Sequence, residues 1–265
     1  MLKFYQKPEF INGFKKLIQE CDKIILDIYK QDFKVEYKDD KSPLTIADQL
    51  SNNHICEYLK KLNKTLEDEI KEQFIIISEE NKNADFEYRK LHNWCWLVDP
   101  IDGTKEFVKK NGQFTVNIGL TYKSNPIFGI VSIPTKDEIY YGVEGIGSFK
   151  ISQNKEEKLI INKNKMEKEI INIVASSSHM NDTTKEFVKK YKKHEIINIG
   201  SSIKLLYVAE NKADIYPRLG PTSEWDTCAA HAVVKYAGGN VYQYDNDKQL
   251  DYNKECLLNP YFIVI

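Results

Sequence analysis

The sequence has few cysteines, and their spacing forms no known pattern. Five cysteines are scattered over 265 residues, at Cys21, Cys56, Cys95, Cys228 and Cys256. Their number is odd and no C-x-x-C pair occurs, which argues against both a disulfide framework and a thiolate zinc site. We therefore expect a protein of a reducing compartment, with enough chain to bury a hydrophobic core without covalent crosslinks.

Long apolar runs and an excess of charge of one sign are also missing. No uncharged apolar segment reaches the roughly 18 residues expected of a membrane span, and the amino terminus opens with no apolar signal region. Lys and Arg number 38 against 39 Asp and Glu, a formal net charge of −1. No broad basic field is present to hold a nucleic acid polymer. We expect a cytoplasmic protein without an integral membrane segment; peripheral association with the inner membrane stays open.

Hydrophobic periodicity divides the first half of the chain into helices and strands. Apolar residues at three- and four-residue steps predict helices over residues 10–28 and 47–62. Short β-branched runs predict buried strands over 74–77 and 94–98, the second ended by the Asp99-Pro100 pair. Two hairpins are expected to follow, with strands over 114–120, 126–133, 138–141 and 147–151.

The second half alternates strands with helices. Strands are predicted over residues 170–175, 195–199, 213–219 and 261–265, and helices over 182–191, 202–211 and 224–237. This alternation predicts a mixed α/β layer architecture. A lysine- and glutamate-rich stretch over 153–168 suggests a boundary between an N-terminal α+β subdomain, residues 1–155, and a C-terminal α/β subdomain, residues 156–265.

Three acidic segments follow predicted strands or open a predicted helix. Glu79 comes directly after the strand over 74–77, Asp99 and Asp102 come after the strand over 94–98, and Asp226 opens the last helix. In α/β sheets, ligand sites collect at strand carboxyl ends and helix amino ends. Taken alone, Asp226 is more often a helix cap and a Glu-Glu pair more often a solvated surface. The segment at 99–104 is harder to explain in that way.

The sequence D-P-I-D-G-T combines two carboxylates with a helix entry. Asp99 and Asp102 can face the same side of the turn, and together with the Ile101 carbonyl they offer the oxygen ligands that Mg²⁺ prefers. Gly103 and Thr104 then offer backbone N–H groups suited to phosphate oxygens. Converging carboxylates repel one another and raise one another's pKa unless cations neutralise them. The segment therefore favours metal-assisted phosphoryl transfer as its role, rather than that of an ordinary helix cap or turn.

Residues 96–107, W-L-V-D-P-I-D-G-T-K-E-F, and 224–239, which begin E-W-D-T-C-A-A-H, resemble the two signatures of the inositol monophosphatase superfamily. More narrowly, I-I-I-S-E-E-N at 75–81, G-T-K-E-F at 103–107 and A-D-I-Y-P-R-L-G-P-T-S-E-W-D at 213–226 resemble bacterial 3'(2'),5'-bisphosphate nucleotidases of the CysQ type. The resemblance implies the layered α-β-α-β-α sugar-phosphatase fold. It also implies a phosphomonoester hydrolase that depends on Mg²⁺ and uses metal-activated water.

The same resemblance assigns roles to individual residues. Two or three Mg²⁺ ions would be held by Glu79, Asp99, the Ile101 carbonyl, Asp102 and Asp226. Asp48 and Thr104 match the pair that orients the attacking water, so Asp48, Glu79 and Thr104 are the expected catalytic residues. Substrate would be bound by Glu79, Ile101, Asp102, Gly103, Thr104 and Asp226 at the phosphate end, and by His179, Ser201, Lys204 and Arg218 at the nucleoside end.

Substrate choice is the open part of this interpretation. The leading hypothesis is conversion of adenosine 3',5'-bisphosphate to AMP and phosphate by a monomer or homodimer, favoured by residues 105–107 and 216–218. The alternatives are an inositol or sugar monophosphatase with the same site, and a nucleotide or metal sensor without catalysis. Lys204 and Arg218 are equally compatible with ordinary surface charges. His231 is expected to face away from Asp226, and its role is left open.

Overall fold

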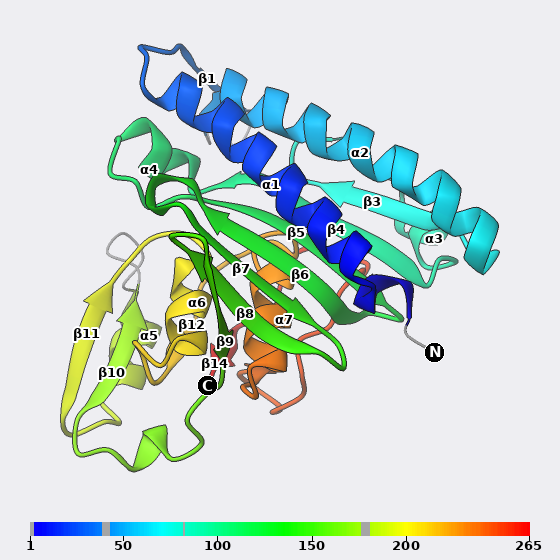
Figure 1. Ribbon diagram of the computed structural model, residues 1–265. Coiled ribbons are helices and arrows are strands. Elements are labelled where there is room, and N and C mark those ends of the chain that lie inside the picture. Colours follow the sequence, from blue (N-terminus) through cyan, green and yellow to red (C-terminus); the bar gives the residue numbers. More distant parts are fainter. Residues whose placement is uncertain (1–2, 39–42, 82, 176–180) are drawn as a thin grey trace.

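A seven-stranded sheet forms the centre of the computed structural model, which describes residues 3–38, 43–81, 83–175 and 181–265 (Figure 1). Its strands, in spatial and chain order, are β3 Phe74–Ser78, β4 Trp94–Asp102, β5 Thr115–Tyr122, β6 Asn125–Ile133, β7 Glu138–Val143, β8 Gly147–Ser152 and β9 Lys155–Leu159. Only the β3–β4 pair is parallel, and the remaining neighbours are antiparallel. The sheet is therefore largely a meander, in which short turns join sequential strands.

Two long helices cover one face of this sheet (Figure 1). They are α1 Pro8–Tyr29 and α2 Ile46–Ile70, and both were predicted. Helix α2 continues beyond the predicted end at residue 62, and Lys71, in a left-handed conformation, caps it. Short strands β1 Val35–Tyr37 and β2 Pro43–Thr45 lead into α2 and were not predicted. The stripe of buried side chains on α1 packs against aromatic residues of the sheet, including Trp96 stacked on Phe14. This packing accounts for the amphipathic pattern of α1.

The opposite face carries the second half of the chain. Helices α6 Ile203–Ala209 and α7 Cys228–Tyr236 lie against this face (Figure 1). Beyond them are two small sheets: the parallel pair β10 Ile171–Ala175 and β11 His194–Asn198, and a three-stranded sheet in the order β12 Tyr216–Arg218, β14 Phe262–Val264 and β13 Val241–Gln243. Helix α5 Asp182–Val188 belongs to the same half of the chain. The mixed α/β layer architecture is thus confirmed. The division into two subdomains at residue 155 stays a prediction. Among the described residues, no helix is both long and apolar enough to cross a bilayer.

The end predicted for the strand over 94–98, which is β4 in the structure, is wrong. β4 does not stop before Asp99 but continues to Asp102, and its register against β5 shifts between these two residues. A bulge of this kind lets a strand pass a proline, whose missing N–H would otherwise leave a gap in the ladder. The two aspartates are therefore carried on a kinked strand, where Asp99 pairs with Asn117 and Asp102 with Thr115.

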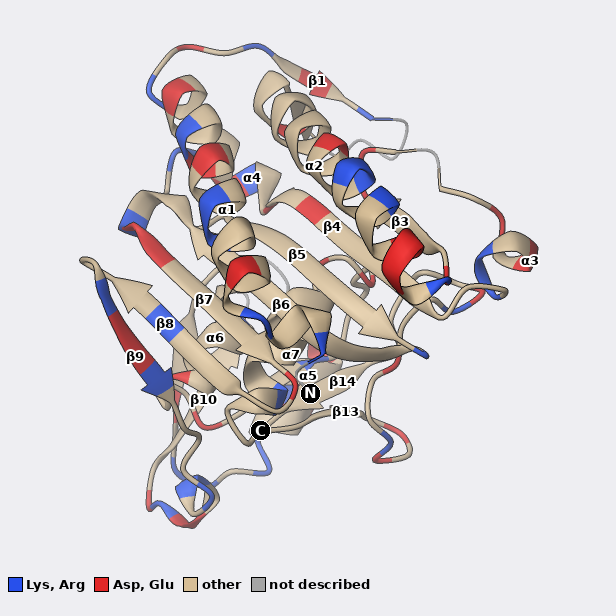
Figure 2. Ribbon diagram, turned by 45° about the vertical axis from the view of Figure 1, so that its right-hand side comes forward, with Lys and Arg blue, Asp and Glu red and all other residues tan. Residues whose placement is uncertain are grey.

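The charged stretch expected to be a boundary contains the edge strand β9. Four of its five side chains are exposed, and each of these four is Lys or Glu. Charged residues on an edge strand hinder pairing with a second molecule, which explains why this strand carries no hydrophobic signal. Figure 2 shows both signs of charge mixed along β9, α1 and α2, in keeping with the near-zero net charge. The short helices α3 Phe86–Arg89 and α4 Thr104–Val108 complete the fold.

A row of glycines brings α7 unusually close to the sheet. Gly119, Gly129 and Gly142 are register neighbours on β5, β6 and β7. A Cβ added at Gly129 would lie 2.2 Å from the carbonyl oxygen of Ala229, and one at Gly142 would lie 2.5 Å from that of Ala232. The α7 backbone thus rests directly on the strands, because no side chain separates the two.

We expect Gly129→Ala to lower the free energy of unfolding by about 1–3 kcal/mol or more, because the new methyl group meets helix backbone that no rotamer change can move. Denaturant titration measures the effect. Gly220→Ala is the matched control, since the nearest atom to its added Cβ is 3.9 Å away. Equal stability of the two variants would contradict close packing as the reason for the glycine row.

Candidate active site

Three carboxylates from different elements meet at one end of the sheet. Because β3 and β4 are parallel and Ser78 pairs with Val98, the residues that follow, Glu79 and Asp99, lie side by side. Asp226 arrives from the turn before α7. One carboxylate oxygen from each of the three lies within 4.8 Å of the other two. The convergence expected from the sequence is present for these three residues.

The electrostatics of this group favour a bound cation. Burial raises the pKa of Asp99 well above its ordinary value, and the charges of Glu79, Asp102 and Asp226 raise it further. Desolvation, with the charges of Asp102 and Glu79, raises the pKa of Asp226 to about 8. Like charges held this close ionise together only when a positive charge compensates them. The donors are all carboxylate oxygens, the ligands of a hard divalent cation such as Mg²⁺, so the donor set fits that ion.

Asp102 lies outside this group of three. Its Oδ2 atom accepts hydrogen bonds from the Ser201 hydroxyl at 2.6 Å and from the Ser202 backbone N–H at 2.5 Å. Ser201 adopts a left-handed backbone with φ of 57°, and its hydroxyl also contacts that of Thr115 at 2.5 Å. These bonds tie the end of β4 to the entry of α6. The role of Asp102 as a metal ligand stays a prediction.

The backbone between the two aspartates is held by their neighbours. The Ile101 N–H donates to Oδ1 of Asp99 at 3.0 Å, and the Ile101 carbonyl accepts from the Thr104 hydroxyl at 3.2 Å. Gly103 caps α4 with φ of 94°, a left-handed conformation that glycine adopts without strain. The Ile101 carbonyl and the amides of Gly103 and Thr104 thus share one tight turn, as expected. Their contacts with metal and phosphate stay predictions.

Asp48 and Thr104 are in contact although far apart in the sequence. The Thr104 hydroxyl lies 3.2 Å from Oδ1 of Asp48. The other oxygen, Oδ2, accepts from the N–H and the hydroxyl of Thr45 at 2.8 and 2.6 Å, which closes a capping box at the start of α2. Burial raises the pKa of Asp48, which is 1% exposed. The pairing expected from the sequence is present, and its role in orienting water stays a prediction.

A pocket extends from Asp102 and Asp226 toward basic side chains. Its lining includes Gly103, Ser201, Lys204 and Arg218. Further lining residues are Glu106, Gly200, Ser202, Leu205, Tyr216, Thr222, Thr227 and Phe262. The carboxylate end and the proposed nucleoside end therefore open into the same cavity. His179 and the neighbouring segment 176–178 lie outside the described residues.

Lys204 was expected to be either a substrate-binding residue or an ordinary surface charge, and the structure contradicts the second interpretation. It is 6% exposed, and its Nζ donates to the Ser201 carbonyl at 2.6 Å. Burial lowers its pKa to about 8, although the Asp102 charge opposes the shift. Arg218 donates to the Pro221 carbonyl through one terminal nitrogen, while its buried Nε has no hydrogen-bond partner among the described residues. Both cations thus keep donor capacity for a further anion.

Lys38 was missed by the sequence analysis. Its Nζ lies 2.8 Å from Oε1 of Glu79 and 2.6 Å from Oε1 of Glu80, so it compensates part of the acidic charge. Although burial opposes its charge, the two carboxylates raise its pKa. It precedes a segment that reads as an ordinary polar turn, so no local signal identifies it. Glu106 was noticed only as part of a motif, and its place in the pocket was not predicted.

Several side chains on α7 and β3 are structural. The Ser78 hydroxyl donates to Oδ1 of Asn52 at 2.7 Å, deep in the interior. His231 is 1% exposed, and its Nδ1 contacts the Tyr252 hydroxyl at 2.9 Å. Burial lowers the pKa of His231 to about 3, so the ring is neutral at physiological pH. This histidine is therefore bonded to a tyrosine of the interior.

Comparison with known proteins agrees with this geometry. The model of the inositol monophosphatase family matches residues 6–261. The chain is 37% identical over 258 residues to the 3'(2'),5'-bisphosphate nucleotidase CysQ of Salmonella typhimurium, covering 94% of this chain and 96% of that one. It is 40% identical over 230 residues to the CysQ of Buchnera aphidicola, covering 85% and 81%.

Solved structures give the same result. The structure of CysQ from Bacteroides thetaiotaomicron, described as a bacterial member of the inositol monophosphatase family, superposes with a TM-score of 0.81 at 38% identity, covering 96% of both chains. An inositol monophosphatase of Thermotoga maritima superposes with a TM-score of 0.74 at 20% identity, which supports the fold alone. The chain therefore belongs to the inositol monophosphatase family.

Proposed function

We propose that this chain is a Mg²⁺-dependent nucleotidase that hydrolyses adenosine 3',5'-bisphosphate to AMP and phosphate. The observation that carries the proposal is a pocket with two unlike ends, with carboxylates at one end and two cations, the buried Lys204 and the half-buried Arg218, at the other. A substrate with two phosphates needs both ends, whereas an inositol monophosphate has no second phosphate for the cations. The names of the relatives that are 36–40% identical support this substrate class.

The family is metal-dependent, and the donor set at the sheet end suits Mg²⁺. In this proposal Glu79, Asp99, the Ile101 carbonyl, Asp102 and Asp226 hold two or three ions. When bound, Mg²⁺ supplies Lewis-acid stabilisation of the phosphate charge and lowers the pKa of water from about 15.7 toward neutrality. The protein supplies the positions of the donors and removes bulk water from around them.

Water orientation is assigned to the Asp48–Thr104 pair. Because Asp48 accepts two hydrogen bonds from Thr45, its carboxylate is fixed, and its remaining oxygen faces the Thr104 hydroxyl. When the hydroxyl donates to Asp48, its oxygen is free to accept a hydrogen bond from a water molecule. That water is then oriented for attack on phosphorus in line with the departing ribose oxygen. No covalent nucleophile from the chain is required.

Substrate binding is divided between the two ends of the pocket. The first-turn amides at Gly103 and Thr104 face no partner within their helix and are proposed to donate to the phosphate that is removed. At the other end, Lys204 and Arg218 are proposed to bind the 5'-phosphate through charge-assisted hydrogen bonds. Ser201 is hydrogen-bonded to both Lys204 and Asp102. An anion next to Lys204 would offset the burial that lowers its pKa, so substrate binding would restore its full charge.

We expect Asp99→Asn to abolish turnover at every Mg²⁺ concentration, because one buried ligand charge is lost from the centre of the group. Phosphate release from adenosine 3',5'-bisphosphate measures the effect. Asp182→Asn, which changes an exposed carboxylate on α5, is the control and should leave turnover unchanged. Substantial activity of the Asp99 variant would contradict its assignment as a metal ligand.

The pocket predicts a preference for a second phosphate. We expect Lys204→Met to lower kcat/KM for adenosine 3',5'-bisphosphate by about 10- to 100-fold, the value of a hydrogen bond to a charged group. Adenosine 3'-monophosphate, which lacks the 5'-phosphate, should be affected far less. Turnover of both nucleotides and of inositol 1-phosphate is compared by phosphate release. If the wild-type protein acts on inositol 1-phosphate alone, the nucleotidase proposal fails.

Metal binding should release protons. The pKa of Asp226 is raised to about 8 in the absence of metal, so its contribution to stability is present at lower pH and is lost as the pH rises through about 8. Mg²⁺ competes with the proton and should therefore stabilise the fold more at pH 8.5 than at pH 6.5. Melting temperatures with Mg²⁺ and with EDTA measure this difference. The Asp226→Asn variant should show a smaller pH dependence, and an equal Mg²⁺ effect at both pH values would contradict the proton linkage.

A further inference from the structure

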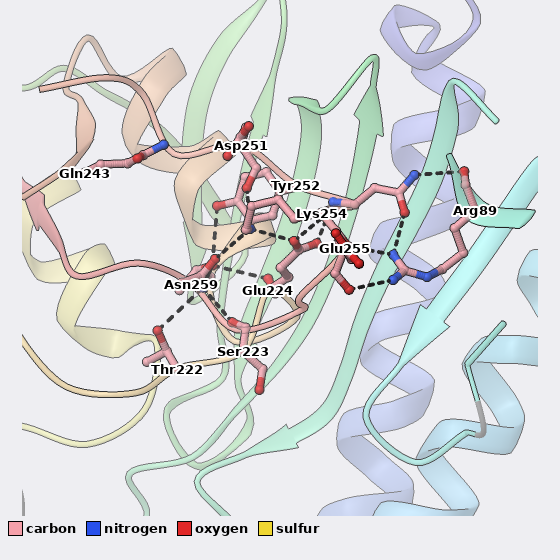
Figure 3. Close-up of polar contacts among 12 residues, drawn as sticks. Arg89, Thr222, Ser223, Glu224, Gln243, Asp251, Tyr252, Lys254, Glu255 and Asn259 are labelled. Carbon is pink, nitrogen blue, oxygen red and sulfur yellow. Dashed lines mark hydrogen bonds and ion pairs between the residues drawn. The ribbon is translucent and has the colours of Figure 1, made fainter. Parts of the chain in front are cut away.

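We propose that Glu224 is a positioning residue for Asp226 and acts through residues 251–259, which we call the clasp loop. The inference rests on the proposed function, since Asp226 is there a Mg²⁺ ligand. Glu224 stands two positions before Asp226 but is not among the residues that line the pocket, and its carboxylate faces Lys254 of the clasp loop (Figure 3). It was not among the residues expected to form the site.

The carboxylate of Glu224 is fully enclosed, with 0% exposure. It accepts hydrogen bonds from the backbone N–H groups of Asn253 and Lys254, at 2.5 and 3.0 Å, and from the Lys254 ammonium at 2.6 Å. A buried carboxylate is tolerated only when such partners compensate its desolvation. Two of these partners are backbone groups, so the Glu224 side chain fixes the path of the clasp loop itself.

The clasp loop in turn holds the residue that orients Asp226. The Asn259 side-chain amide donates to the Ser223 carbonyl at 2.8 Å, and the Glu224 N–H donates to the Leu257 carbonyl at 2.9 Å. The N–H of Ser223 then donates to Oδ2 of Asp226 at 2.9 Å. An unbroken chain of bonds therefore runs from the clasp loop through Ser223 to a proposed metal ligand.

Arg89 connects the clasp loop to the other proposed ligands. The residue is 4% exposed and ends α3, in the connection between β3 and β4. Its guanidinium donates to the Asn253 side chain at 2.8 Å and to the Lys254 and Glu255 carbonyls at 3.1 and 3.3 Å (Figure 3). The strands on either side of this connection lead to Glu79 and Asp99. The clasp loop thus joins the segment carrying two ligands to the turn carrying the third.

This arrangement predicts an effect on metal affinity beyond an effect on folding. Outer residues that orient metal ligands typically change affinity or activity by about 10- to 100-fold when altered. The Glu224 carbonyl also accepts from the N–H groups of Thr227 and Cys228 at 3.3 and 3.1 Å, so a shift at Glu224 moves the start of α7. A small displacement there changes the distance from Asp226 to Asp99, which is held in the sheet by the pairing of β4 with β5.

The test compares Glu224→Gln with the matched variant Asp214→Asn. Asp214 is also 0% exposed, pairs with the Lys168 ammonium at 2.6 Å and accepts the Asn172 N–H at 2.8 Å, but has no bond to the clasp loop. We expect Glu224→Gln to bind Mg²⁺ about 10- to 100-fold more weakly by calorimetric titration without substrate. Asp214→Asn should keep the wild-type affinity. At saturating Mg²⁺, the KM of the Glu224 variant for the nucleotide should return to the wild-type value.

Each outcome either supports or contradicts the positioning role of Glu224. Wild-type Mg²⁺ affinity in folded Glu224→Gln, or equal weakening in both variants, would overturn the positioning role while leaving the proposed function standing. Absence of Mg²⁺ binding to the wild-type protein would overturn the proposed function and the positioning role together. If Glu224→Gln does not fold, Asn259→Ala takes its place, since it removes the bond to the Ser223 carbonyl and leaves the Glu224 carboxylate paired. Unchanged affinity in that variant would equally overturn the role.

Discussion

The close approach of α7 to the central sheet is the constraint on which the site depends. Gly119, Gly129 and Gly142 remove every side chain from the line where the helix backbone crosses the strands. With larger residues there, α7 would stand farther from the sheet, and Asp226 would move away from Asp99. The distance between two proposed ligands is thus set by the absence of side chains at positions that precede Asp226 by 84 to 107 residues. In this fold the packing of the core therefore also determines the geometry of the site.

The same packing creates an electrostatic cost that the surrounding residues offset only in part. Burial raises the pKa of Glu79, Asp99 and Asp226, and the charge of Glu79 adds to the shift at both aspartates. Lys38 compensates Glu79 from one side, and Asp102 is turned toward Ser201 and Ser202. The negative charge between the three carboxylates stays uncompensated. Protein sites store such costs where function requires them, and a divalent cation is the simplest means of relieving this one.

Most of the elements, and the acidic residues that meet at the end of the sheet, could be predicted from the sequence because their signals are local. An apolar strand followed by an acid, as at Glu79 and Asp99, needs only neighbouring residues to be recognised. The bulge in β4 and the edge strand β9 were missed because a proline and a run of charges read as breaks, although sheets accommodate both. The partners of Lys38, Arg89 and Glu224 could not be predicted, since each is decided by segments that meet only in the folded chain.

Substrate choice and catalysis are separable in this architecture for a structural reason. The proposed ligands leave rigid elements, the ends of β3 and β4 and the start of α7, which the sheet and the clasp loop hold in place. The basic end of the pocket instead comes from Lys204, near the start of a short helix, and from Arg218, on a three-residue strand. In the proposed function, changes at these positions would alter which group meets the far end of a substrate without moving Asp99. One scaffold can therefore keep its phosphate chemistry while its relatives differ in the molecule that carries the phosphate.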